Sequence, residues 1–459
     1  MSFCVHCRRT AITLLRRSSD IFYKCKGPIQ SIKRQKHQNP EPDPYLPPPP
    51  PMSFPMWEPR DFFFFEEVHR SRKPGSRARV GRIHTPHGIV DTPGYVAVAT
   101  NGALKFVDHQ AHGSQLQFCN SYHLMLQPGP ETIAACGGLH KLMNRDKPII
   151  TDSGGFQIFS MAYKSVHDEL NMKARGGHGG KHAPSVIQVT EEGVQFRSYR
   201  DGRAVTLTPE STVAAQKAYG SDIIIPLDEL PPYHIDRDSL IKSVLLTHRW
   251  EARSLRAHLE SPQNQAMYCV LHGGVDRGLR RASVEYLREL PFDGFAIGGS
   301  LGKDRDELIA LLGFLMPLIP THQPNHLLGV ADVESIHRAV PLGVDTFDSC
   351  FPTRNARHGT VLHRATKGDK TLSLGPGVKS VFEDGIAQLA LKKKIFETDM
   401  RPIDENCSCM TCKSHSRAYL HHLLRANEPM AATLLTIHNL KFMADLMAEI
   451  RQKILADEI

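Results

Sequence analysis

The chain has no hydrophobic run long enough to cross a bilayer as a helix. Among its 459 residues the longest nearly apolar stretch, 308–320, has 13 residues and contains prolines, whereas a membrane helix needs about 20. Cysteine is scarce at 10 residues, and tryptophan occurs only twice. So few cysteines exclude a disulfide scaffold and favour a reducing compartment. The composition, 41% hydrophobic and 23% charged, is that of a globular protein with one large core and appendages.

Acidic side chains are almost missing from residues 1–38. This segment holds nine of the 56 Lys and Arg but only one of the 48 Asp and Glu, so it carries the whole net charge of +8 and leaves the rest neutral. A short apolar stretch at 11–15 is flanked by arginines, as in organelle transit peptides. We expect a targeting leader, for a mitochondrion in preference to a plastid. The alternative is a basic arm that contacts RNA on a cytoplasmic protein.

The remainder of the chain divides by composition into three parts. Residues 39–78 are a proline-rich linker leading into the folded body, with five consecutive prolines at 47–51 that favour a stiff polyproline helix. Short apolar runs alternate with amphipathic helices over 79–400. Residues 401–459 hold a cysteine cluster and helical patterning without a strand signal. We expect this last part to form a metal-stapled subdomain packed on the preceding one.

The apolar runs between 79 and 400 indicate a parallel sheet that is buried on both faces, because they are nearly uninterrupted. They occupy residues 95–99, 148–151, 222–227, 267–271, 294–297, 326–330 and 345–347. Repeated strand-then-helix units over roughly 300 residues predict a (β/α)8 TIM barrel. An open, doubly wound sheet is the competing fold.

Three aspartates, Asp152, Asp228 and Asp348, each follow a predicted strand. In a barrel the carboxyl ends of the strands meet at one mouth, where reacting groups lie. A single aspartate in this position commonly caps a helix. Three of them together favour a carboxylate site.

Glycine pairs follow three of the predicted strands, at Gly154-Gly155, Gly273-Gly274 and Gly298-Gly299. Tight turns would explain one pair. Because glycine lets a flat ligand approach the backbone amides, three pairs at one mouth indicate a planar, hydrogen-bonding substrate such as a nucleobase. Phe156 could supply a stacking face. The loop 352–359 (PTRNARHG) would bind polynucleotide phosphates, unless it is only a solvated basic loop.

Cys407, Cys409 and Cys412 with His438 form the strongest local signal. Three thiolates and an imidazole complete a tetrahedral zinc shell with no open position, so we expect one structural Zn²⁺ per chain. Further histidines nearby leave the fourth ligand open; they are His415, His421 and His422.

Several motifs together resemble the queuine tRNA-ribosyltransferase family, also called tRNA-guanine transglycosylases. They lie at residues 120–129 (NSYHLMLQPG), 152–157 (DSGGFQ), 190–194, 246–250, 347–354 (FDSCFPTR) and 417–422, in matching order from about residue 79 onward. The family is a (β/α)8 barrel with a structural zinc subdomain. The resemblance implies exchange of the guanine at the wobble position of tRNAs for Tyr, His, Asn and Asp with a 7-deazaguanine base. It also implies a homodimer, or a heterodimer with an accessory subunit.

The resemblance assigns roles to individual residues. Asp348 matches the nucleophile that forms a covalent ribosyl-enzyme intermediate, and Asp152 matches the proton acceptor and donor. The implied base-binding residues are Asp152, Ser153, Gly154, Gly155, Phe156, Asp228, His272, Gly298, Gly299 and Leu328. The implied RNA-binding residues are Gly329, Val330, Ala331, Asp332, Val333, Glu334, Ser335, Thr353, Arg354, Asn355, Ala356 and Arg357.

Three positions depart from the pattern of many members. His272 replaces a glutamine that contacts the base. Gly302 and Leu230 stand where bacterial members that use the 7-aminomethyl-7-deazaguanine precursor tend to have a bulkier residue and a cysteine. The room left at Gly302 favours queuine as the incoming base, with the precursor as the alternative.

Two other functions compete with this prediction. A noncatalytic accessory subunit of the same enzyme would tend to lack the carboxylates, which this chain keeps. A barrel glycoside hydrolase would also use two carboxylates, but the two tryptophans, the arginine loop and the cysteine cluster argue against it.

Overall fold

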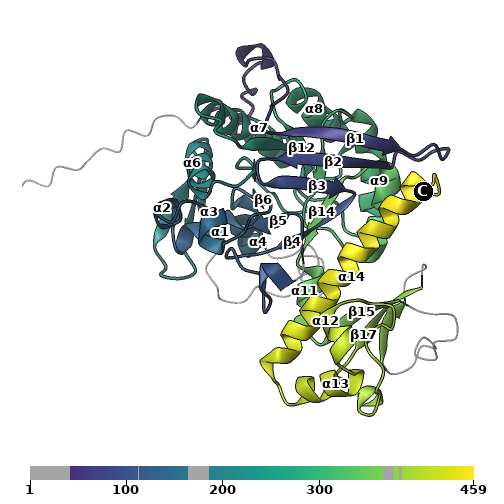
Figure 1. The fold of residues 1–459 in the computed structure, drawn as a ribbon. Helices are drawn as coiled ribbons and strands as arrows, with labels where there is room; N and C mark the ends of the chain where they lie inside the picture. The colour runs from purple at the N-terminus through teal and green to yellow at the C-terminus, as the bar shows by residue number, and fades with distance from the viewer. Residues whose placement is uncertain (1–41, 112, 164–185, 365–376, 382–384) are drawn as a thin grey trace, which may run out of the picture. The chain divides into compact units, whose positions relative to one another are not determined.

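The computed structural model describes residues 42–111, 113–163, 186–364, 377–381 and 385–459 (Figure 1). The predicted leader at 1–38 and the start of the linker lie outside these ranges. Residues 43–459 form one compact unit. None of the helices in the described ranges is long and apolar enough to cross a membrane.

Eight parallel strands close into a barrel. In order around the barrel they are β4 (Gly94–Val98), β5 (Gln117–Cys119), β6 (Ile149–Thr151), β10 (Ile223–Ile224), β11 (Ala266–Leu271), β12 (Gly294–Ile297), β13 (Asn325–Leu327) and β14 (Thr346–Ser349). The barrel closes between β14 and β4, where Thr346 pairs with Gly94. The predicted (β/α)8 fold is therefore confirmed, and the open sheet is excluded.

Helices surround the strands, as Figure 1 shows. They are α1 (Ser121–Leu126), α2 (Pro130–Ala135), α3 (Leu139–Met143), α4 (Gly155–Tyr163), α6 (Pro209–Tyr219), α7 (Arg237–Glu260), α8 (Arg277–Leu287), α9 (Arg305–Leu315), α10 (Val333–Ala339) and α11 (Phe351–Arg357). Several begin at an aspartate whose carboxylate accepts a hydrogen bond from the first turn, as Asp276 does from the Leu279 amide. Such caps fix where each helix leaves its preceding loop. Short 3₁₀ helices occupy Pro51–Ser53, His109–Ala111, Met316–Leu318, Val340–Leu342 and Lys394–Phe396.

Two antiparallel sheets flank the barrel. One consists of β1 (Phe64–Arg70), β2 (Arg79–Thr85) and β3 (Gly88–Thr92), and the other of β7 (Val186–Val189), β8 (Val194–Arg197) and β9 (Ala204–Leu207). A buried ion pair joins the first sheet to the barrel, because Arg79 Nη2 lies 2.6 Å from Asp345 Oδ2, just before β14.

The described part of the proline-rich segment packs on α7 and α8. The Tyr45 hydroxyl donates to Asp238 of α7, and the Tyr286 hydroxyl of α8 donates to the Pro49 carbonyl. The proline run therefore contacts the barrel helices.

The C-terminal part combines a small sheet with helices. Strands β15 (Thr360–Arg364), β16 (Val378–Val381) and β17 (Ile386–Ala390) precede α12 (Met410–Ser414), α13 (Arg417–Arg425) and α14 (Pro429–Leu455). One apolar cluster joins these elements and includes Leu389, Leu420 and Leu435. Farther along α14, Met443 and its neighbours pack into the barrel core. This long helix thus ties the cysteine region to the barrel, while the domain bounds stay a prediction.

Candidate active site

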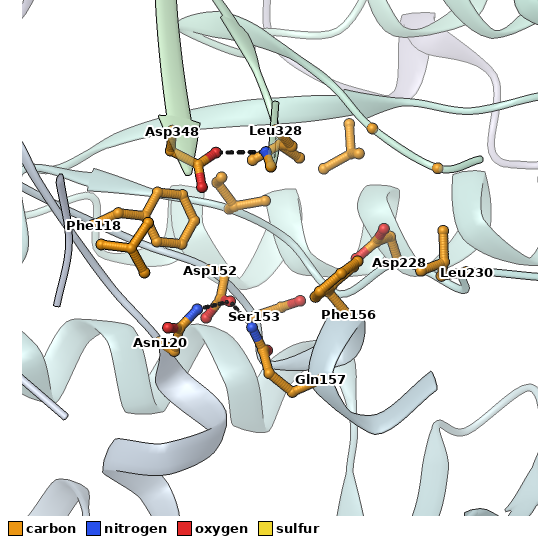
Figure 2. A pocket seen from close by; sticks show the side chains of 16 residues that line it. Phe118, Asn120, Asp152, Ser153, Phe156, Gln157, Asp228, Leu230, Leu328 and Asp348 are labelled. Atoms are coloured by element: carbon orange, nitrogen blue, oxygen red, sulfur yellow. Dashed lines mark hydrogen bonds between the residues drawn. The ribbon is translucent and has the colours of Figure 1, made fainter. Parts of the chain in front are cut away.

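A cavity of about 170 Å³ opens at the carboxyl ends of the barrel strands (Figure 2). Each of the eight strands, or the loop that follows it, contributes to the wall. The lining residues are Val98, Phe118, Asn120, Asp152, Ser153, Phe156, Gln157, Ile225, Asp228, Leu230, Val270, Gly298, Gly299, Leu328, Gly329 and Asp348. The three aspartates, which are separated by up to 196 positions in the numbering, therefore share one cavity.

Asp152 follows β6 and is surrounded by hydrogen-bond donors. Its Oδ1 accepts from the Ser121 amide at 2.7 Å, and its Oδ2 accepts from Asn120 Nδ2 at 2.9 Å and Gln157 Nε2 at 3.0 Å. Burial nevertheless raises the pKa of this carboxyl to about 6, and the facing Asp348 adds to the increase. A carboxyl with a pKa near neutral pH can both give and take a proton.

Asp348 lies in β14 and is held on one side only. Its Oδ1 accepts from the Gly329 amide at 2.8 Å, a bond drawn in Figure 2, and lies 3.0 Å from His326 Nε2. The side chain is largely buried but reaches the cavity. Two donors on one oxygen leave the other oxygen for a substrate.

Asp228 follows β10 and is supported from behind by His272. The Nε2 atom of His272 lies 2.9 Å from Asp228 Oδ2. His272 itself is 2% exposed and is not part of the cavity wall. The structure thus places this predicted base-binding residue behind the carboxylate rather than at the cavity surface.

Some of the other predicted base-binding residues line the cavity and others lie behind its wall. Ser153, Phe156, Gly298, Gly299 and Leu328 line the cavity, and Phe156 is 56% exposed at its rim. Gly154 and Gly155 do not line it. A Cβ on Gly154 would lie 2.9 Å from the Tyr122 amide nitrogen, so this glycine is needed for the close approach of α1.

The predicted RNA-binding segments flank the same mouth. Gly329 to Asp332 lead into α10, and Thr353 to Arg357 lie in α11. The exposed or partly exposed positions are Gly329, Val330, Asp332, Glu334, Arg354, Asn355 and Arg357. The side chains of Ala331, Val333, Ser335, Thr353 and Ala356 are buried, because they form the inner faces of these helices and loops.

The cysteine cluster is assembled with His438 from α14. The four potential ligand atoms of Cys407, Cys409, Cys412 and His438 lie within 4.8 Å of one another. His438 Nε2 lies 2.7 Å from the Leu362 carbonyl, to which it must donate, so Nδ1 presents its lone pair to the sulfurs. This tautomer and donor set fit a closed, tetrahedral zinc site. His421 instead contacts the Leu391 carbonyl through Nδ1.

Sequence reasoning gave no role to three residues around the carboxylates. Asn120 and Gln157 fall within the quoted motifs and hold Asp152. His326 opens a predicted strand and contacts Asp348. A polar residue at the start or end of a buried strand was the signal that could have identified Asn120 and His326, although β5, which precedes Asn120, was itself missed.

These features define a barrel enzyme of the glycosyl-transferring class, in which two carboxylates in different settings face one small cavity. A family model described as Queuine tRNA-ribosyltransferase matches residues 74–459. A protein of that name from Protochlamydia amoebophila (strain UWE25) is 54% identical over 401 residues, covering 87% of this chain and 97% of the relative. A namesake from Chlamydia felis (strain Fe/C-56) is 48% identical over 398 residues, covering 86% and 99%. The chain therefore belongs to the queuine tRNA-ribosyltransferase family and is a pentosyltransferase.

Proposed function

We propose that this enzyme exchanges guanine at the wobble position of tRNAs for Tyr, His, Asn and Asp with queuine, through a covalent ribosyl-Asp348 intermediate. The observation that carries the proposal is the contrast between two carboxyls in one cavity. Asp152 is buried with a pKa of about 6, whereas Asp348 has two donors on Oδ1.

In the first half-reaction, Asp348 Oδ2 attacks C1′ of the ribose and the C1′–N9 bond breaks. Protonated Asp152 gives its proton to the departing guanine, which leaves as the neutral base. The enzyme then holds the tRNA as a ribosyl ester, and Asp152 is a carboxylate.

In the second half-reaction, N9 of the incoming base attacks C1′ and the C1′–Oδ2 bond breaks. Asp152 takes the N9 proton, and Asp348 is released as a carboxylate. Both groups return to their starting states, so one base replaces another without net consumption of a proton.

Recognition of the base would fall to the remaining cavity residues. Asp228 and the Gly298-Gly299 backbone present hydrogen-bonding groups, and Phe156 and Leu328 offer apolar surfaces for the ring. The predicted RNA-binding positions that are exposed or partly exposed, Arg354 and Arg357 among them, would contact the anticodon stem-loop.

The Asp348→Asn variant tests the covalent step. It should abolish exchange of labelled guanine and the denaturation-resistant tRNA adduct, because an amide is a poor nucleophile, while tRNA affinity stays within about threefold as expected for an isosteric change. Arg288→Gln, an exposed change on the outer side of the barrel, serves as the control. Continued exchange by Asp348→Asn would remove Asp348 from its role.

The choice of base is tested with queuine and the 7-aminomethyl precursor on one tRNA. Leu230 lines the cavity, whereas Gly302 does not, and a Cβ there would meet the Glu307 side chain. The preference for queuine therefore comes from the resemblance. We expect kcat/KM for queuine to exceed that for the precursor by at least tenfold, the size of effect expected from one pocket contact. Efficient use of the precursor alone would establish the alternative substrate. Lack of exchange by the chain alone would show that the reaction requires a second protein.

We extend the proposal to the metal, the assembly and the location. Zn²⁺ would bind Cys407, Cys409, Cys412 and His438 and would stabilise the fold without taking part in the exchange. The enzyme would act as a homodimer or as a heterodimer with an accessory subunit, which analytical sedimentation would test. It would be located in an organelle, which cell fractionation would test.

A further inference from the structure

A buried imidazole stands directly behind the proposed nucleophile. His326 lies on β13, opposite Thr346 on β14, and its side chain is fully buried. Nε2 is 3.0 Å from Asp348 Oδ1 and Nδ1 is 2.8 Å from the Thr346 hydroxyl. The Phe118 ring lies nearly parallel to the imidazole, at 21° with centroids 6.0 Å apart. Both ring nitrogens of His326 thus have a hydrogen-bonding partner, and Phe118 stacks on one face of the ring.

The hydrogen-bond pattern places a proton on Nε2. Thr346 has one hydroxyl proton and two neighbouring acceptors, His326 Nδ1 and the Asn325 carbonyl at 3.0 Å. If the hydroxyl donates to Nδ1, the neutral ring carries its proton on Nε2. If it donates to Asn325, Nδ1 carries a proton, and contact with a carboxylate requires Nε2 to carry one as well. In both arrangements Nε2 donates to Asp348.

A second donor reaches the same oxygen. Gly329 has a φ of +75°, a conformation that glycine adopts readily, and this turn aims its amide at Asp348 Oδ1 with a distance of 2.8 Å. No hydrogen bond found among the described residues reaches Oδ2. The two oxygens of the carboxylate therefore differ, with Oδ1 held by the protein and Oδ2 facing the cavity.

We propose that His326 is a positioning residue that, together with the Gly329 amide, reserves Asp348 Oδ2 for attack and stabilises Asp348 as the leaving group. This inference rests on the proposed function. When the incoming base displaces the ester, the C1′–Oδ2 electron pair returns to the carboxylate. The charge spreads to Oδ1, where two N–H groups are already in place and need no reorganisation.

The two donors affect the two half-reactions unequally. The donors lie on the ester carbonyl oxygen of the intermediate, so they accelerate its breakdown. They also stabilise the carboxylate before attack, so they give no comparable help to its formation. Loss of the His326 donor should therefore let the ribosyl-enzyme accumulate, whereas a general packing defect would slow both steps.

The test compares His326→Met with His326→Gln in the full chain. Both side chains are unbranched and similar in length, but only glutamine can donate to Asp348 Oδ1 while accepting from Thr346. Pre-formed adduct with labelled tRNA is mixed with excess guanine, and its discharge is followed on denaturing gels. We expect His326→Met to slow discharge roughly ten- to hundredfold, the range for a hydrogen bond to a charged group. Formation should slow less, and His326→Gln should recover most of the rate.

Thr346→Val provides a second variant that keeps the imidazole and removes its Nδ1 partner. It should slow discharge in the same direction by a smaller factor, even if His326→Met does not fold. Unchanged discharge, or equal slowing of formation and discharge, in the folded variants would overturn the role of His326. Absence of any adduct with the wild-type enzyme would instead refute the proposed function, and this inference with it.

Discussion

At the scale of single residues, the Asp152 carboxyl couples stability to pH. Burial raises its pKa from 3.8 to about 6, so between these values the folded chain holds a proton that the unfolded chain has released. Stability should therefore fall as pH rises from about 4 to 6 and stay low above that. Asp152→Asn removes this dependence. Its unfolding free energy relative to wild type should increase by about 2 kcal/mol between pH 4 and pH 7, measured by urea denaturation.

The slope of unfolding free energy against pH is the quantity to compare, because the amide introduced by Asp152→Asn also changes the hydrogen bonds with Asn120 and Gln157. Those changes are the same at every pH, so they shift the curve without tilting it. The exposed Asp61→Asn serves as the matched control. Parallel curves for wild type and Asp152→Asn would show that the folded carboxyl does not retain its proton. In that case another group must supply the proton to guanine.

The site residues easiest to predict from the sequence were the aspartates that directly follow barrel strands. A carboxylate after a strand is visible in the sequence because the strand end fixes its place at the mouth, and Asp152, Asp228 and Asp348 do line one cavity. His272 was placed at the base from a resemblance alone, but it is behind Asp228. Depth behind the cavity wall depends on how neighbouring strands pack, which a single chain position does not encode.

At the scale of elements, the polarity of the strand residues decided which strands could be predicted. Seven barrel strands overlap the predicted apolar runs, whereas β5 has three residues and begins with Gln117. That glutamine is fully buried, so polarity concealed a core strand. The repeat of strand and helix on both sides of the gap favoured a barrel without excluding an open sheet, and the pairing of β14 with β4 shows that the sheet is closed.

The link between α12 and α14 should depend on metal. Cys412→Ser removes one thiolate from the cluster formed with His438, so we expect loss of bound zinc and a fall in the unfolding free energy of more than about 3 kcal/mol. Zinc content by atomic absorption and denaturant unfolding would measure both. Cys136→Ser, at an exposed cysteine, should change neither. A zinc-free Cys412→Ser of undiminished stability would show that the apolar cluster around Leu435 suffices without metal.

At the scale of the whole molecule, charge separates the first 38 residues from the rest. The chain beyond them is neutral overall, so tRNA affinity of the folded body must come from local patches such as the exposed Arg354 and the partly exposed Arg357 of α11. If residues 1–38 are a targeting leader, their deletion should leave tRNA affinity and its salt dependence unchanged.

If residues 1–38 bind RNA instead, their deletion has a different measurable effect. A basic arm that binds phosphates would add to the slope of log K against log salt by about 0.7 for each phosphate contact on single-stranded RNA. Deletion would then lower both the affinity and the slope. Filter binding between 50 and 200 mM salt compares the full chain with the deletion variant. A second experiment fuses residues 1–38 to a fluorescent reporter and follows its location in cells. Import of the reporter into mitochondria, with an unchanged slope, is the expected result. A cytoplasmic reporter together with a reduced slope would establish the arm as part of the RNA-binding surface.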